Sequence, residues 1–150
     1  MKDSKRIWVW VGVAVVVLAV IFSLLWRPKA PQAPTSPTAV FAPQGQLTPN
    51  FPKELILDPQ AQFTTSYSVN YNPTLNQYTA EWNSSSSLVT LYNNYKTYFG
   101  SNGWTITNSS GATNASKIAV MYAATSTANV NVSFVAQGKG TGMSVSYAGQ

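Results

Sequence analysis

A run of twenty residues without a charge lies near the start of this chain. Residues 7–26 read IWVWVGVAVVVLAVIFSLLW. As an α-helix rising ~1.5 Å per residue, the run would measure ~30 Å, which is the thickness of a bilayer core. Tryptophans stand at both of its ends, where the headgroup region of a bilayer favours indole rings. The sequence therefore predicts a transmembrane helix over residues 7–26, with the lipid bilayer as a partner.

The flanks of this run predict its processing and orientation. The run ends in Leu-Leu-Trp-Arg-Pro rather than in the small residues of a signal-peptide cleavage site, so we expect an uncleaved signal-anchor. Basic residues are slightly more numerous on its N-terminal side, and the charge-poor remainder of the chain suits export. We therefore expect a cytoplasmic tail over residues 1–6 and localisation as a single-pass protein of the cell membrane, with the C-terminal domain extracytoplasmic.

The net charge of +5 lies mostly beside the membrane run. Residues 1–6 contribute +2, and Arg27 with Lys29 contributes another +2, which leaves +1 for residues 51–150. That C-terminal part contains no arginine and no basic stripe. Binding to a phosphate backbone depends on clustered basic side chains, so the sequence excludes nucleic acid as a partner.

Residues 27–50 are rich in proline and read RPKAPQAPTSPTAVFAPQGQLTPN. Six of the nine prolines of the chain fall in this segment. Proline at this density opposes helix and sheet and favours an extended polyproline II chain of ~3.1 Å per residue. The segment is therefore predicted to be an extended linker, with a reach of up to ~70 Å, that carries a domain over residues 51–150.

Alternation of apolar and polar residues after position 51 is typical of half-buried strands. Two strands joined by a turn at Asn72 and Pro73 are predicted from the same-face residues Phe63, Thr65, Tyr67, Val69 and Tyr71, then Tyr78, Ala80 and Trp82. Three later strands are predicted from Ile118, Val120 and Tyr122, then Val130, Val132 and Phe134, then Met143, Val145 and Tyr147. Residues 138–142 form the turn between the last two, and short strands are predicted at 104–107 and 55–57.

One helix is predicted between the two sets of strands. Serines precede it as N-caps, Gly100 and Gly103 end it, and its apolar residues follow at helical spacing: Leu88, Leu91, Tyr92, Tyr95, Tyr98 and Phe99. A single helix covers only one face of a sheet. The predicted fold class is therefore α+β, an antiparallel β-sheet with one helix packed on it in the order β-β-α-β-β-β, preceded by the N-terminal transmembrane helix and the Pro-rich linker.

The stretch LYNNYKTYFGSNGW, over residues 91–104, resembles one in uncharacterised bacterial exported domains. Those domains are membrane-anchored or lipid-anchored, and their helix carries an apolar-Tyr pair and ends in a Gly-Trp motif. The resemblance implies a bacterial envelope protein and brings no function with it. This chain has no cysteine, so it lacks the attachment point of the lipid-anchored members.

The residue types that most enzymes need are missing from the sequence. The chain contains neither histidine nor cysteine, which removes the commonest general base, the commonest metal ligand and the thiol nucleophile. Three carboxylates remain after residue 51, at Glu54, Asp58 and Glu81, and none lies in a recognisable catalytic pattern. We expect no enzyme activity, no catalytic residue, no metal and no cofactor.

Aromatic residues are the one feature that suggests a binding surface. Tyrosine presents a flat apolar body with a polar tip, which suits contact with sugars or with proteins. The candidate binding residues are Tyr67, Tyr71, Tyr78 and Trp82, although aromatic side chains more often fill a core. Trp104, which follows the helix-ending Gly103, is expected in the core, and its replacement by alanine is expected to cost ~3–5 kcal/mol of stability.

Three functions remain open from the sequence. The first is a non-enzymatic, membrane-tethered interaction module of the cell envelope, which binds another envelope protein or copies of itself. The second is a structural subunit of a surface filament or assembly, packed through its apolar N-terminal helix. The third is a glycan-binding domain that uses exposed tyrosines. The sequence does not choose among them.

Overall fold

The computed structural model describes residues 37–72 and 74–149. The predicted cytoplasmic tail, the transmembrane helix and the first ten residues of the predicted linker lie outside these residues. Within the described part of the chain, none of the helices has the length and apolar character needed to cross a membrane.

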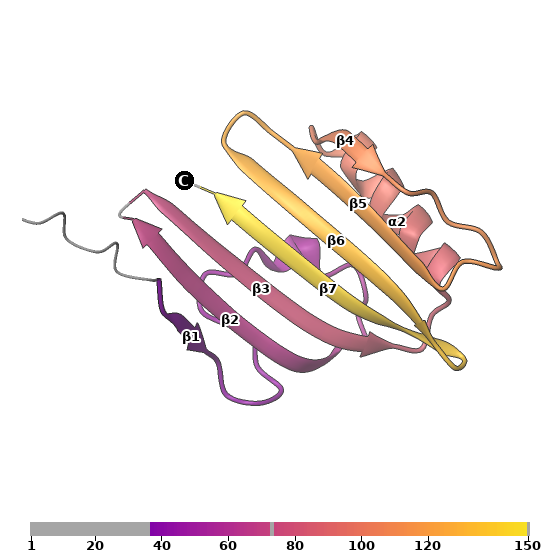
Figure 1. Cartoon of the computed structure of the whole chain (residues 1–150), viewed down its shortest axis with the longest axis horizontal. Coiled ribbons are helices and arrows are strands. Elements are labelled where there is room, and N and C mark those ends of the chain that lie inside the picture. The colour runs from indigo at the N-terminus through magenta and orange to yellow at the C-terminus, as the bar shows by residue number, and fades with distance from the viewer. Residues whose placement is uncertain (1–36, 73, 150) are drawn as a thin grey trace, which may run out of the picture. The chain divides into compact units, whose positions relative to one another are not determined.

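Seven antiparallel strands form one sheet in the order β1-β2-β3-β7-β6-β5-β4 (Figure 1). Their bounds are β1 Ala39–Phe41, β2 Gln62–Asn72, β3 Leu75–Ser84, β4 Thr105–Ser109, β5 Ile118–Ala124, β6 Ala128–Gln137 and β7 Gly140–Gly149. The last strand, β7, lies between β3 and β6 at the centre of the sheet. The predicted α+β class, an antiparallel sheet with one helix, is therefore confirmed. The predicted order β-β-α-β-β-β lacks the edge strand β1, and four strands rather than three follow the helix, the first of them close to the short strand predicted at 104–107.

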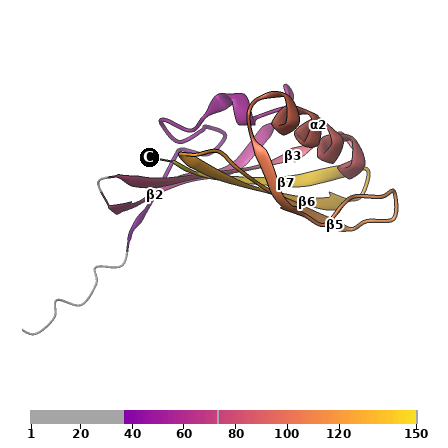
Figure 2. The same ribbon diagram turned by 90° about the horizontal axis from the view of Figure 1, so that it is seen from above.

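The α-helix α2 (Leu88–Ser101) begins at the N-cap Ser87, whose side-chain oxygen accepts a hydrogen bond from the Thr90 backbone N–H at 3.2 Å. It ends before Gly103, which adopts the left-handed conformation, with φ 75°, that glycine allows after a helix. Helix α2 and the segment between β1 and β2 lie on the same side of the sheet (Figure 2). Among the described residues, no helix or connecting segment packs on the other face, which we call the uncovered face.

The core lies between that face of the sheet and the two segments that cover it. Trp82, Phe134 and Val145 come from the sheet, Tyr95 and Phe99 from α2, and all are at most 1% exposed. Leu55, in a short 3-10 helix (Lys53–Leu55), joins the same cluster. The Tyr95 hydroxyl donates a hydrogen bond of 2.5 Å to the Leu55 carbonyl, which ties the helix to the segment before β2.

Residues 37–50 belong to the folded domain, which corrects the predicted boundary at residue 51. The compact unit begins at Pro37. Strand β1 pairs Ala39 with Val69 and Phe41 with Tyr67, and the backbone N–H of the buried Thr48 donates to Ser66 Oγ at 2.9 Å. The prolines of this segment flank β1 instead of interrupting it. Their density led to the prediction of a linker here.

Strands β2 and β5 depart from the predicted facing of their side chains. A register shift after Phe63 turns that side chain to the covered face, opposite Trp82, while Thr65 and Tyr67 remain on the uncovered face. In β5 the buried residues are Ala119, Met121 and Ala123, and the larger set, Ile118, Val120 and Tyr122, faces outward. Two of these three buried residues are alanines, so the buried positions of β5 do not stand out as apolar in the sequence pattern.

Two predicted short elements also differ. Residues 138–142 do not all form a turn, since only Gly138 and Lys139 separate β6 from β7, and Gly138 has a φ of 57°. Positive φ at the first position is what a two-residue hairpin loop requires. Residues 55–57 do not form a strand, because Leu55 closes the 3-10 helix.

Candidate functional site: a polar valley along the central strand

The uncovered face of the sheet carries polar side chains in rows that cross β3, β7 and β6. The pairing register sets four such rows: Gln77, Ala148 and Asn129; Thr79, Ser146 and Asn131; Glu81, Ser144 and Ser133; Asn83, Gly142 and Val135. In each row the residue on β7 is the smallest or equal to the smallest. We call these twelve residues the β7 valley.

Small side chains on the central strand make the face hollow. Two hollows of about 250 Å³ each lie in the valley, one around Ser144 and Gly142 and one around Ser146 and Ala148. At ~3.4 Å per residue, the distance from Gly142 to Ala148 is about 20 Å. The valley is therefore long enough for several units of an extended chain.

Hydrogen bonds hold the side chains at one end of the valley in place. Gln77 Nε2 donates to Ser146 Oγ at 2.9 Å, and Ser146 Oγ lies 2.8 Å from Thr79 Oγ1. Gln77 Oε1 accepts a 3.1 Å bond from the hydroxyl of Tyr71. These side chains come from three neighbouring strands, so their amide and hydroxyl groups are fixed before any ligand arrives.

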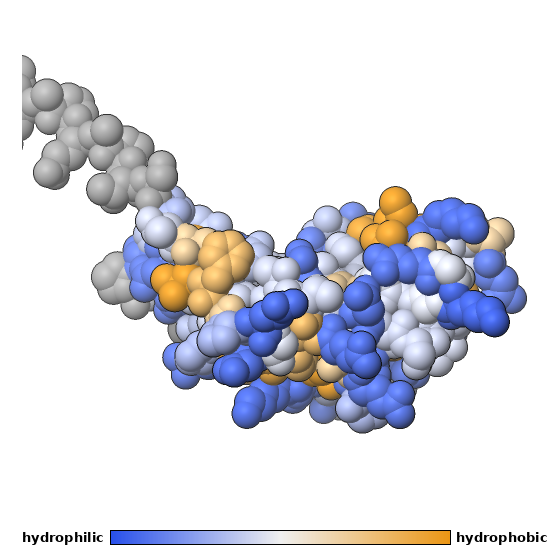
Figure 3. All heavy atoms as spheres, turned by 90° about the horizontal axis from the view of Figure 1, so that it is seen from below, coloured by the Kyte–Doolittle hydropathy of each residue, from blue (hydrophilic) through white to orange (hydrophobic). Residues whose placement is uncertain are grey.

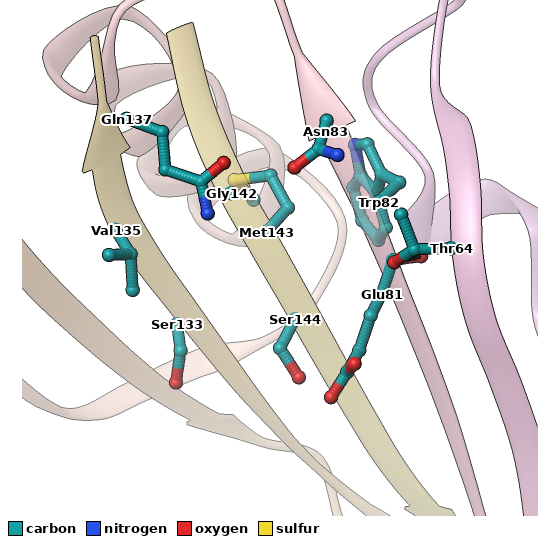
Figure 4. A pocket seen from close by; sticks show the side chains of 10 residues that line it. All are labelled: Thr64, Glu81, Trp82, Asn83, Ser133, Val135, Gln137, Gly142, Met143 and Ser144. Carbon is teal, nitrogen blue, oxygen red and sulfur yellow. Dashed lines mark hydrogen bonds between the residues drawn. The ribbon is translucent and has the colours of Figure 1, made fainter.

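Gln137, just beyond the last row, closes the other end of the valley beside Asn83, Gly142 and Val135. Figure 4 shows the Gln137 amide beside Gly142, with Asn83 and Glu81 on the opposite side of β7. A methyl group at position 142 would overlap Gln137 Nε2. The glycine thus leaves room for the amide over the central strand. A glycine inside a strand often marks such a close approach.

The middle of the valley contains an acceptor with unused capacity. Asn131 Oδ1 is buried and has no hydrogen-bond partner among the described residues. Asn131 pairs across the sheet with Ser146 on one side and with the 40% exposed Tyr122 on the other. A buried carbonyl of this kind favours a ligand that brings a donor group.

The structure does not bring the four predicted binding residues together. Tyr67 and Tyr71 lie on the uncovered face, where the ring of Tyr67 is 5.2 Å from that of Phe41. Tyr78 and Trp82 lie on the covered face, Tyr78 beside Tyr147 and Trp82 only 1% exposed. Strand alternation separates the two pairs. Only Tyr71 contacts the valley, through its hydrogen bond to Gln77.

Sequence reasoning missed the residues that line the valley. The signal was present in β6, where Asn129, Asn131 and Ser133 alternate with the buried Val130, Val132 and Phe134. The same alternation in β7 places Ser144 and Ser146 on one face of the sheet and the buried Met143 and Val145 on the other face. Polar residues in a half-buried strand normally face solvent without a role, so the pattern gains meaning only when the central position of the strand is known.

Another hollow, of about 400 Å³, lies along α2 and is lined by Leu57, Asn94, Thr97, Tyr98, Ser101 and Asn102. Five of these six residues come from one helix and its C-cap, so this hollow lacks facing walls. The valley has walls from three strands. It is the better candidate for a site.

Comparison with known proteins leaves the site without a precedent, since no protein-family model, curated protein or solved structure matches this chain. The case for a function therefore rests on the residues of the valley themselves.

Proposed function

We propose that this protein is a non-enzymatic binding module, tethered to the cell membrane, whose β7 valley holds a neutral, hydroxyl-rich chain of the kind found in envelope glycans. The observation that carries the proposal is the row of small residues on β7 between walls of amide and hydroxyl side chains. Such groups both donate and accept hydrogen bonds, as sugar hydroxyls do.

The chemistry of the valley argues against other ligand classes. A stable protein interface has an apolar, water-excluding centre, whereas the row Thr79, Ser146 and Asn131 crosses the middle of this valley. This disfavours the partner protein, or second copy of the chain, that the sequence left open. Glu81 is the only charged residue among those that line the valley, so an anionic polymer would find no cation there.

Binding without turnover fits the same residues. Glycoside cleavage normally needs two carboxylates on either side of the scissile bond. The described residues that line the valley supply one, Glu81. A single carboxylate orients a sugar by accepting hydrogen bonds from adjacent hydroxyls. We therefore propose recognition and no hydrolysis.

The experiment uses the domain from residue 37 to 150 in native gels that contain a soluble neutral polysaccharide: a dextran, a mixed-linkage β-glucan or a mannan. At least one polymer is expected to retard the wild-type domain. Ser144→Leu places a branched side chain in the valley and is expected to weaken binding at least about tenfold, or ~1.4 kcal/mol. The matched control, Ser109→Leu, makes the same change on the exposed strand β4 and is expected to bind as the wild type does.

Two results would contradict the proposal. If none of the polysaccharides retards the domain, the ligand class is wrong. If Ser144→Leu and Ser109→Leu bind equally well, the valley is not the site. Thermal unfolding of both variants establishes that any loss of binding is not a loss of fold.

A further inference from the structure

Exposed apolar side chains gather at one end of the sheet. Seven large hydrophobic residues are exposed among the described residues, and four of them lie in β1 or at the hairpin between β2 and β3: Val40, Phe41, Tyr71 and Leu75. We call this end of the sheet, comprising β1 and residues 71, 72, 74 and 75, the tether end, because the described chain begins there. Figure 3 shows a hydrophobic patch at this end.

Charge is absent from the segments that build the tether end. Residues 37–50, 59–80 and 140–150 contain no Asp, Glu, Lys or Arg. The opposite end of the sheet differs, since Lys117 directly precedes β5 and Lys139 lies in the loop between β6 and β7. The two ends therefore differ in charge: the tether end is apolar and uncharged, whereas the far end combines basic residues with the exposed pair Ile118 and Val135.

The number of residues between the predicted anchor and the domain limits the reach of the connection. The predicted membrane run ends at Trp26 and the folded unit begins at Pro37. Ten residues, 27–36, lie between them, and when extended at ~3.1 Å each they reach about 30–35 Å. Five of the ten are prolines or basic residues: Arg27, Pro28, Lys29, Pro31 and Pro34. A short tether of this kind raises the effective concentration of the domain at the bilayer to ~mM, so weak contacts suffice.

We propose that the tether end docks on the surface of the bilayer that holds residues 7–26. Aliphatic side chains and tyrosine at an uncharged edge suit the headgroup region, where amphipathic rings are favoured. The outer edge of β1, which pairs with no other described strand, would then face hydrated headgroups that can hydrogen-bond its backbone, instead of remaining open to another strand. The inference goes beyond glycan binding and depends only on the predicted anchor.

Docking in this way would also orient the valley. Strand β7 runs from the far end of the sheet to the tether end. It begins at Gly140 at the far end, and its last residue, Gly149, pairs with Asn76 beside the hairpin between β2 and β3. With the tether end on lipid, the valley runs away from the membrane. A strand of glycan could then enter it from the far end.

The test uses the full-length chain in vesicles of phosphatidylcholine and phosphatidylglycerol, and it benefits from a chain that has no cysteine. Val40→Cys at the tether end and Ile118→Cys at the far end, which are 65% and 64% exposed, each receive an environment-sensitive fluorophore. Lipids that carry a bromine quencher are expected to quench the label at position 40 several-fold more strongly than the label at position 118. Equal, solvent-like quenching at both positions would overturn the proposal.

Two further outcomes distinguish this proposal from others. In the first, the label at position 40 becomes shielded from solvent as the protein density in the vesicles rises, with no quenching by brominated lipid. That result would mean that a second copy of the chain covers the tether end, and it would also overturn the docking proposal. A chain that fails to float with vesicles would overturn both the anchor and the docking, while polysaccharide binding by residues 37–150 would be unaffected. Tyr71→Cys repeats the measurement at an independent position of the same end and guards against a local effect of one label.

Discussion

At the residue scale, Gly142 illustrates a conflict between stability and the proposed site. Glycine inside a strand costs about 0.5–1 kcal/mol relative to alanine, and this position lies in the central strand of the sheet. The residue that a methyl group would meet is the flexible end of Gln137, not backbone. The position can therefore accept alanine, but the Gln137 amide would have to move away from β7.

We predict that Gly142→Ala leaves the domain as stable as the wild type, or more stable by up to about 1 kcal/mol, and weakens polysaccharide binding. The control is Gly100→Ala in α2, where nothing lies within 4 Å of the added methyl group. That variant should gain about 1 kcal/mol from helix propensity with binding unchanged. Urea unfolding and gel retardation of the two variants decide the matter, and undiminished binding by Gly142→Ala would show that Gln137 does not need its place over β7.

The two tryptophans of the domain differ in burial. Trp82 is 1% exposed and packs edge-on against Phe63 at 6.0 Å, whereas Trp104 is only partly buried, beside Phe99 at 5.6 Å. We predict that Trp82→Ala costs ~3–5 kcal/mol and that Trp104→Ala costs less. Chemical unfolding measures both losses. The reverse order would mean that the aromatic cluster around Trp82 repacks after truncation.

Tyr95 makes stability sensitive to alkaline pH. Burial raises the pKa of Tyr95 far above its ordinary value of ~10. Above pH ~10 the unfolded chain loses this proton while the folded domain keeps it, so the stabilising effect is complete below that pH and declines as the pH rises further.

Tyr95→Phe is therefore predicted to lose about 1–3 kcal/mol at pH 7, because the Leu55 carbonyl loses its partner. The same variant should lose less additional stability than the wild type between pH 9 and pH 11. Urea unfolding at a series of pH values compares the two slopes. Parallel slopes would exclude Tyr95 as a source of the alkaline sensitivity.

At the scale of elements, strand β1 shows that the domain begins inside the segment that reads as a linker. Removing residues 37–50 would leave the Ser66 carbonyl without the 2.8 Å bond from Ala42 N–H and remove Leu47 from the edge of the core. We predict that a fragment starting at Phe51 is less stable than one starting at Pro37 by about 2–5 kcal/mol, from the loss of several hydrogen bonds and of apolar contact. Equal urea midpoints for the two fragments would place β1 outside the cooperative fold.

The sequence predicted the elements whose pattern is local. Helix α2 and strands β3, β6 and β7 follow from apolar periods of 3.6 and 2, and from Ser87 and Gly103 at the helix ends. Strand β1 was missed because three residues give no period and six prolines surround the region. The register shift in β2 could not be foreseen, because a bulge leaves no reliable mark in the sequence around Phe63.

The site was harder to predict than the fold for a reason of topology. Gln77 and Ser146 are 69 residues apart, and they meet only because β7 inserts between β3 and β6. Alternation assigns a residue to one of two faces but does not say which strands are neighbours. Tyrosine was therefore favoured for its chemistry alone. The prediction grouped Tyr78 and Trp82 with Tyr67 and Tyr71, although the first pair lies on the covered face and the second pair on the uncovered face.

At the scale of the whole molecule, the proposed function needs both a folded binding domain and an anchor that remains attached. Residues 7–26 provide the length and apolar character for a membrane helix, and no small-residue cleavage pattern follows them. The domain from Pro37 onward has its own core, so cleavage between the two parts would release a folded but untethered module.

We predict that the protein stays in the membrane fraction after washing with alkaline carbonate and that it keeps residues 1–26. Alkaline carbonate removes peripheral proteins but does not displace a membrane-spanning run of twenty uncharged, mostly apolar residues, because transferring that run to water costs more free energy than surface contacts can supply. Peptide sequencing of the membrane-bound protein identifies its first residue, and a chain without residues 7–26 serves as the control that should be recovered in the wash. A mature N-terminus between residues 27 and 36 would show that the apolar run is a signal peptide. In that case the tether end would lose its short connection to the bilayer, and glycan binding in the valley would be the function of a released protein.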